Sequence, residues 1–185
     1  VPPHLPRPHR QRQGDRDGMK ARLVFALAAA LWVAGTARDR FDAWVAATDL
    51  PSLSLANGAE VVARDGRLLR AWTVADGRWR LAAQLPTTDP LWRAMLLAYE
   101  DRRFYSHAGV DLQALARAAL QSALAGRVVS GGSTLTMQVA RLLEESGTGA
   151  LHGKLRQMRL ALALERQLSK DEILGLYLHL APYGG

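Results

Sequence analysis

The sequence contains no cysteine, and this absence excludes disulfide bonds and thiolate metal sites while leaving the redox compartment open. It also contains no internal repeat and no Walker phosphate-binding loop. Its length of 185 residues suffices for one ordinary domain with a tail, but not for two large domains. Because 49% of the residues are hydrophobic, the chain can bury a core, and wholesale disorder is not expected.

Acidic residues are scarce relative to basic ones, with 17 Asp and Glu against 24 Lys and Arg. The net charge of +7 and the pI of about 10.5 favour a polyanionic partner, which could be nucleic acid, anionic lipid or pyrophosphate. No nucleic-acid-binding motif is present, so nucleic acid is not expected as a partner. The basic excess is strongest before residue 23, in Arg7, Arg10, Arg12, Arg16, Lys20 and Arg22.

Residues 23–37 carry no charge and are mostly apolar, although they fall short of the ~20 residues of a comfortable transmembrane helix. A signal anchor, a cleaved signal peptide and a buried core helix are the three interpretations. The basic flank favours an uncleaved signal anchor with its N-terminus inside, whereas Ala-Gly-Thr-Ala at 34–37 keeps cleavage open. We therefore predict a disordered, basic cytoplasmic tail at 1–22, an anchor at 23–37 and a connector at 38–58.

A small β segment is predicted at 59–86, followed by a helical domain at 87–185. Asp65-Gly66 lies between two strand-like runs, which is a strong hairpin signal, and Asp76-Gly77 marks a second turn. From residue 87 onwards the apolar spacing is helical and predicts five helices, the fourth of which runs from Lys154 to Leu168 after a loop at 147–153. The helix-start signals are Asp89 with Pro90, Asp111, and Ser169 with Glu172. The fold class is mainly α.

Three groups of residues can carry chemistry. Glu100 ends the first helix of the domain and is followed by a loop with His107, which suits a general base; the alternative is a solvated charge cluster. The Gly-rich loop at 131–134 opens a helix whose free N–H groups and hydroxyls suit a phosphate; the alternative is an ordinary helix cap. Lys154 and Glu165 lie on one face of the fourth helix, where they can hold a phosphate and orient a neighbour; the alternative is that they are snorkelling side chains at the ends of a core helix.

The order and spacing of these groups resemble the family-51 glycosyltransferases, the lysozyme-like domain of class A penicillin-binding proteins and of monofunctional transglycosylases. The resemblance rests on EDRRFYSHAGVD at 100–111, GGSTLTMQ at 131–138, KLRQ at 154–157 and KDEILGLYL at 170–178. It covers roughly residues 55–185. The phrase SGGSTLTMQVARLL at 130–143, together with KLRQ, is most similar to the 1C type of penicillin-binding protein.

The resemblance implies a peptidoglycan glycosyltransferase that polymerises lipid II into glycan strands on the outer, periplasmic face of the bacterial inner membrane. Glu100 would be the general base, and undecaprenyl pyrophosphate would leave with inversion. Other cell-wall synthesis proteins would be partners. The resemblance also implies which residues surround the substrate and its pyrophosphate. They are Asp101, Phe104, His107, Ser133, Thr134, Gln138, Arg141, Lys154, Arg156 and Gln157, and Glu165 and Tyr177 would support them. Phe104 would lie near the lipid.

The sequence departs from the family pattern at several positions. Gln157 stands where most members have a second Glu, and His179 where Asn is usual. Residues 144–151 contain no Lys or Arg, although a basic donor-site residue is common there. No cofactor is required and no metal ligand is predicted, although a divalent cation, Mg²⁺ or Mn²⁺, at the donor pyrophosphate stays open. We also expect the glycosyltransferase domain to be incomplete at its C-terminal end.

Two other functions compete with polymerisation. A non-catalytic, membrane-anchored module that binds lipid II or the cell wall is favoured by Gln157 and by the lack of basic residues at 144–151. Lysozyme-like hydrolysis would use Glu100 as an acid on a β-1,4 bond. Formation of polymer from lipid II, as opposed to shortening of preformed glycan, separates the two enzymatic alternatives.

Overall fold

The computed structural model describes residues 10–81, 85–127, 131–144 and 151–182, with side chains from residue 18 onwards. The chain divides into two units, one ending at Ala46 and one beginning at Ala47. Each unit is described by itself.

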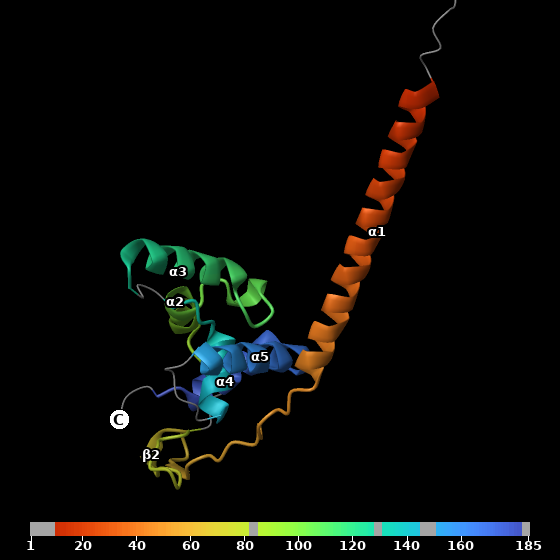
Figure 1. Ribbon diagram of the computed structural model, residues 1–185. Helices are drawn as coiled ribbons and strands as arrows, with labels where there is room; N and C mark the ends of the chain where they lie inside the picture. Colours follow the sequence, from red (N-terminus) through yellow and green to blue (C-terminus); the bar gives the residue numbers. More distant parts are fainter. Residues whose placement is uncertain (1–9, 82–84, 128–130, 145–150, 183–185) are drawn as a thin grey trace, which may run out of the picture. The chain divides into compact units, whose positions relative to one another are not determined.

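The first unit is a single long helix, α1 (Arg10–Ala46), drawn in red to orange in Figure 1. Its stretch Gly18–Ala46 has 29 residues and contains an 18-residue window with a mean hydropathy of 1.4, so it is long and apolar enough to cross a membrane, as signal sequences also are. Within the described residues none of the tested apolar window is buried, which does not support the alternative of a core helix.

The helix α1 is longer than the predicted anchor at 23–37. It begins at Arg10, inside the segment predicted to be disordered, and continues through the first residues of the predicted connector. Once a helix is nucleated, each further residue adds a hydrogen bond, and the Arg, Gln, Lys and Ala that flank the apolar stretch are good helix formers. The remainder of the predicted tail, residues 1–9, lies outside the described residues.

The second unit starts with an extended connector and a small hairpin. Leu50, Leu53 and Leu55 of the connector pack against the helical core. The hairpin pairs β1 (Glu60–Val62) with β2 (Leu68–Ala71) in antiparallel register. The predicted turn is confirmed: the Asp65 carboxylate accepts the backbone N–H of Arg67, and Gly66 has a φ of 81°. The strands are shorter than the two runs that the sequence pattern predicted.

The remaining elements are helical, as predicted. They are η1 (Leu85–Thr87), α2 (Pro90–Glu100), η2 (Phe104–Ser106), α3 (Leu112–Ala125), α4 (Leu135–Glu144), α5 (Leu151–Gln167) and α6 (Lys170–Leu180). The helix α5 starts three residues before the predicted Lys154, inside what was predicted as a loop, because neither His152 nor Gly153 carries a stop signal strong enough to prevent the helix. The rest of that predicted loop, residues 147–150, lies outside the described residues.

The predicted helix starts are confirmed by their hydrogen bonds. The Asp89 side chain accepts the backbone N–H groups of the first turn of α2, and Asp111 does the same for α3. At α6 a complete capping box forms: the Ser169 side chain accepts the backbone N–H of Glu172, and the Glu172 side chain accepts the backbone N–H of Ser169. These caps are local interactions and therefore fix the ends of the helices that carry the site.

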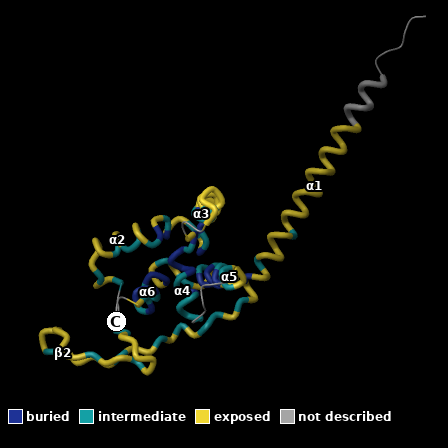
Figure 2. Tube along the Cα trace, turned by 60° about the vertical axis from the view of Figure 1, so that its left-hand side comes forward, coloured by how far each residue is buried: buried dark blue, intermediate teal, exposed yellow. Residues whose placement is uncertain are grey.

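The core lies between α4, α5 and α6. Figure 2 shows the buried positions gathered in these three helices, while α3 is mostly exposed. The helical spacing of apolar residues correctly predicted α2. In the described part of the chain, however, no element covers the face that carries Leu91 and Met95, whose side chains are 70% and 63% exposed. The core cluster consists of Phe104, Leu135, Val139, Ala140, Leu160, Leu164, Ile173, Leu174, Tyr177 and Leu180.

Candidate active site

Glu100 is the last residue of α2, and its side chain meets α4. The amide Nε2 of Gln138 donates a hydrogen bond of 2.8 Å to the carboxylate Oε2 of Glu100. The cap at Asp89 starts α2, and the chain leaves the helix directly after Glu100, so the carboxylate lies at a helix end that can be reached from outside. The structure thus brings the first two sequence motifs together at this carboxylate.

Glu100 and Gln138 line a cleft with a volume of about 800 Å³. One wall is the apolar side of α2, and the other comes from α4, α6 and the residues that follow α6. Glu100 is the one acidic residue among the lining side chains of the described chain, and Arg141 is the one basic residue. The other lining residues are Trp92, Met95, Leu96, Ala98, Tyr99, Tyr177, Ala181 and Pro182.

Tyr177 of α6 joins the charged end of this cleft. Burial raises the pKa of the Tyr177 phenol, the negative charge of Glu100 raises it further, and the positive charge of Arg141 opposes the shift. The phenol therefore stays protonated around neutral pH and can donate a hydrogen bond. Its side chain is 6% exposed, so the position of its ring is fixed by the core.

A cationic corner forms where α5 meets the loop before α4. The Lys154 ammonium donates a hydrogen bond to the hydroxyl of Ser133. Partial burial lowers the pKa of Lys154, and the positive charge of Arg141 lowers it further. Two cations thus lie within electrostatic range of each other, next to the first turn of α4. The positive end of the helix dipole favours an anion there, although Asp101 and Thr134 already accept the N–H groups of Leu135 and Met137.

Asp101 and His107, both predicted to bind substrate, lie behind Glu100 and hold the loop to α4. The buried Asp101 carboxylate accepts the backbone N–H of Leu135 and a hydrogen bond from His107 Nε2, each at 2.9 Å. His107 Nδ1 accepts the N–H of Gly109, which puts the proton of the neutral ring on Nε2. These two side chains position the start of α4.

Phe104 and Thr134 are buried as well. The Phe104 ring is 1% exposed and lies in the core, with the Lys170 ammonium 4.4 Å from its centroid, so it does not present the lipid-facing surface that was predicted. An aromatic ring in a charge-rich loop gave no sign of facing inwards. The Thr134 hydroxyl donates to the carbonyl of Gly109 at 2.6 Å and is 2% exposed.

The predicted residues of α5 have different surroundings. Gln157 is 6% exposed, and Arg156 pairs with Glu144 of α4 at 2.9 Å. The Glu165 carboxylate accepts hydrogen bonds from Thr136 and Lys170. Sequence analysis missed Thr136, Lys170 and the apolar wall of α2. The spacing of Trp92, Leu96 and Tyr99, which ends next to Glu100, was the available signal for that wall.

Comparison with known proteins decides the family. The transglycosylase family matches residues 65–185, which is more than half of the chain. The chain belongs to the transglycosylase family. Its mainly helical second unit with one small hairpin fits the lysozyme-like fold expected of this transglycosylase domain.

The relatives of this transglycosylase are penicillin-binding proteins. The chain is 51% identical to penicillin-binding protein 1C of Escherichia coli (strain K12) over 125 residues, 68% of this chain and 16% of that protein. It is 46% identical to penicillin-binding protein 1A of Pseudomonas aeruginosa over 84 residues, 45% of this chain and 10% of that protein. It is 45% identical to penicillin-binding protein 1A of Neisseria gonorrhoeae over 85 residues, 46% of this chain and 11% of that protein. The transglycosylase chain therefore spans less than a fifth of the length of these relatives.

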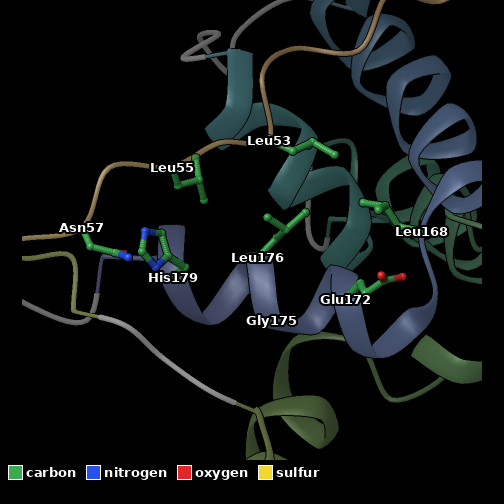
Figure 3. Close-up of a pocket in the computed structure, with 8 residues that line it drawn as sticks. All are labelled: Leu53, Leu55, Asn57, Leu168, Glu172, Gly175, Leu176 and His179. Carbon is green, nitrogen blue, oxygen red and sulfur yellow. The ribbon is translucent and has the colours of Figure 1, made fainter.

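A second hollow of about 450 Å³ lies on another face of α6 in this transglycosylase domain (Figure 3). It shares no lining residue with the Glu100 cleft, so the two are separate. Leu53 and Leu55 of the connector face Leu176 there, and Asn57 lies beside His179. None of the side chains proposed from the motifs for catalysis or phosphate binding lines it. The lining residues are Leu53, Leu55, Asn57, Leu168, Glu172, Gly175, Leu176 and His179.

Proposed function

We propose that this transglycosylase polymerises lipid II into the glycan strands of peptidoglycan, with Glu100 as the general base. The observation that carries the proposal is the position of the Glu100 carboxylate: it lies in a large cleft, hydrogen-bonded to Gln138 and next to Tyr177 and Arg141. A fixed carboxylate at the charged end of a partly apolar cleft matches a substrate with a sugar, a pyrophosphate and a lipid.

The proposed reaction makes use of this geometry. The 4-hydroxyl of the acceptor lipid II loses its proton to Glu100 while its oxygen attacks the anomeric carbon of the donor, whose bond to pyrophosphate breaks with inversion. An alcohol is a poor nucleophile, so proton removal during the attack lowers the barrier. Gln138 holds Oε2 of the carboxylate, and we assign Oε1 to the acceptor hydroxyl.

The leaving pyrophosphate needs positive countercharge, which Lys154 and Arg141 supply in this proposal. The hydroxyl of Ser133, which lies next to Lys154, adds a hydrogen-bond donor on the same side. Because burial lowers the pKa of Lys154 and Arg141 adds to the shift, an incoming anion relieves a repulsion that is present in the free site. Such preorganised charge stabilises the negative charge that develops as the bond breaks.

The cleft offers few protein ligands to a divalent cation at the pyrophosphate. Mg²⁺ and Mn²⁺ at such sites are held by one or two carboxylates together with the phosphates and water, and among the lining residues of the cleft only the general base Glu100 carries a carboxylate. Gln157 is neutral, and the described part of the chain contains no group of three or more His, Asp or Glu placed to bind a metal. We therefore assign the neutralisation of the phosphates to Lys154 and Arg141.

The lipid and the membrane complete the proposal. The apolar residues Trp92, Met95 and Leu96 provide a wall of the cleft for the undecaprenyl chain. We propose that α1 is a single-pass anchor with its basic N-terminal end in the cytoplasm, which places the catalytic unit on the outer face of the inner membrane. Other cell-wall synthesis proteins are the expected partners there.

The test is polymerisation of labelled lipid II by the full-length natural protein in proteoliposomes, beside the variant Glu100→Gln. We expect polymer from the wild type and a loss of about 100-fold or more in the variant. Equal polymer from both would sink the assignment of Glu100. Lipid II binding without polymer would favour a non-catalytic binding module, for which the neutral Gln157 is the supporting observation, and shortening of preformed glycan would favour hydrolysis.

A further inference from the structure

Glu165 of α5 is a buried carboxylate that joins two neighbouring helices. Its Oε1 accepts a hydrogen bond of 2.6 Å from the hydroxyl of Thr136 on α4 and another of 2.6 Å from the ammonium of Lys170 on α6. The Glu165 side chain is 8% exposed and that of Lys170 is 19% exposed. One oxygen atom therefore ties α4, α5 and α6 together in a largely dry environment, where such contacts are strong and costly to break.

The same cluster also reaches the loop that follows Glu100. The Lys170 ammonium lies over the ring of Phe104, 4.4 Å from its centroid. Gly109 packs so closely that a side chain there would come within 3.1 Å of Cγ of Glu165. Glu165 thus contacts, directly or through Lys170, both ends of the loop between α2 and α3.

The cluster is coupled to the catalytic carboxylate through α4. Thr136 and Gln138 lie two residues apart in the first turn of that helix, and Gln138 holds Glu100 at 2.8 Å. Glu165 itself does not line the cleft. A change at Glu165 can therefore reach the reaction only by moving α4 or the loop, and a shift of about 1 Å suffices to weaken a proton transfer strongly.

We infer that Glu165 is a positioning residue, which sets the distance between Glu100 and Gln138 by fixing the first turn of α4 against α5 and α6. The inference rests on the proposed glycosyltransferase function. It predicts that disturbing the Glu165 cluster lowers kcat while leaving substrate affinity nearly unchanged, because the cationic corner of Lys154 and Ser133 is built from other contacts.

The experiment measures lipid II polymerisation by the full-length protein with Thr136→Val and Glu165→Gln, each checked for folding by thermal melting. Thr136→Val keeps the shape of the side chain and removes one hydrogen bond to Glu165. We expect kcat to fall about 10-fold or more in both variants, with KM for lipid II within 2-fold of the wild type. Unchanged kcat in folded Thr136→Val would overturn the inference, even if Glu165→Gln fails to fold.

A double-mutant cycle with Gln138→Ala distinguishes positioning from a general loss of stability. If Glu165 acts through Gln138, adding Glu165→Gln or Thr136→Val to Gln138→Ala lowers kcat no further. Losses that multiply would show that the cluster acts elsewhere and would overturn the inference.

The matched control is Tyr105→Phe. Its hydroxyl also joins the loop after Glu100 to α6, through a 2.9 Å hydrogen bond to Asp171, but outside the Glu165 cluster. We expect its kcat to stay within 2-fold of the wild type. Absence of polymer from the wild type itself would count against the proposed function, whereas an active wild type with equally active variants would count against Glu165 alone.

Discussion

The amide nitrogen of Gln138 lies 2.8 Å from the carboxylate of Glu100, although 38 residues separate them in the sequence. The contact orients the carboxylate without adding a charge next to it. Because the amide fixes one oxygen of the carboxylate, the other oxygen is already in place to take the proton when the acceptor arrives.

The electrostatic coupling of Lys154 and Arg141 predicts a shift that can be titrated. Because burial and Arg141 lower the pKa of Lys154 below its ordinary value of 10.5, Arg141→Gln removes one of the two causes and raises this pKa. The measurement is an NMR titration of lysine Cε in the folded protein. Arg156→Gln is the control, because Arg156 pairs with Glu144, and we expect this variant to leave the pKa of Lys154 unchanged. A lower Lys154 pKa in Arg141→Gln would contradict the arrangement.

The same shift has a consequence for stability. With its folded-state pKa lowered, Lys154 binds fewer protons in the folded chain than in the unfolded chain at pH values just below 10.5. The free energy of unfolding therefore gains a contribution that rises with pH through this window, and Lys154→Met abolishes that contribution. Chemical denaturation of both proteins across the window checks the sign.

The charge arrangement at the pyrophosphate predicts that polymerisation does not depend on a divalent cation. We expect the rate of the wild type to stay within 2-fold when a chelator is added, because Lys154 and Arg141 supply the countercharge. Gln157→Glu adds a carboxylate to a residue that is 6% exposed, and we expect measurable Mn²⁺ binding by electron paramagnetic resonance in that variant alone. A 10-fold loss of wild-type rate with chelator, restored by Mg²⁺, would refute the assignment.

Replacing each of two glycines by alanine should change the free energy of unfolding in opposite directions. Gly109 has a φ of +91°, and a Cβ there would lie 2.7 Å from the carbonyl oxygen of Ala161. Gly109→Ala should therefore lower the free energy of unfolding by about 3 kcal/mol. Gly175 lies inside α6 with nothing within 4 Å of a Cβ, so Gly175→Ala should raise it by about 0.5–1 kcal/mol. Urea unfolding measures both, and shifts of the same sign would be incompatible with this packing.

Local signals predicted much of the fold from the sequence. The caps at Asp89, Asp111 and Ser169 act within one helical turn, so the residues alone sufficed to place the helix starts. The start of α5 was missed because its first turn has no comparable signal. The burial of Phe104 was missed because the residues that surround its ring, such as Leu135, Leu160 and Lys170, lie far along the chain and are brought close only by tertiary packing.

In the candidate site, too, the local sequence predicted some features and tertiary packing decided others. The motif spacing indicated Glu100, Ser133 and Lys154, and the structure brings Lys154 to Ser133 and Gln138 to Glu100. The division of labour between Glu100, which lines the cleft, and Asp101, which is buried behind it, could not be predicted. Both are acidic and adjacent, and the hydrogen bonds of Asp101 to Leu135 and His107 decide which one faces outwards.

Because Glu100 and Asp101 are adjacent but have different surroundings, the length of α2 cannot change freely. Each residue added to or removed from a helix turns everything beyond it by about 100°. One insertion between Asp89 and Glu100 would rotate Glu100 out of the cleft and at the same time pull Asp101 away from Leu135 and His107. Family members are therefore expected to keep the length of this helix constant while varying its exposed side chains, and engineered insertions belong in the hairpin loop around Asp65 instead.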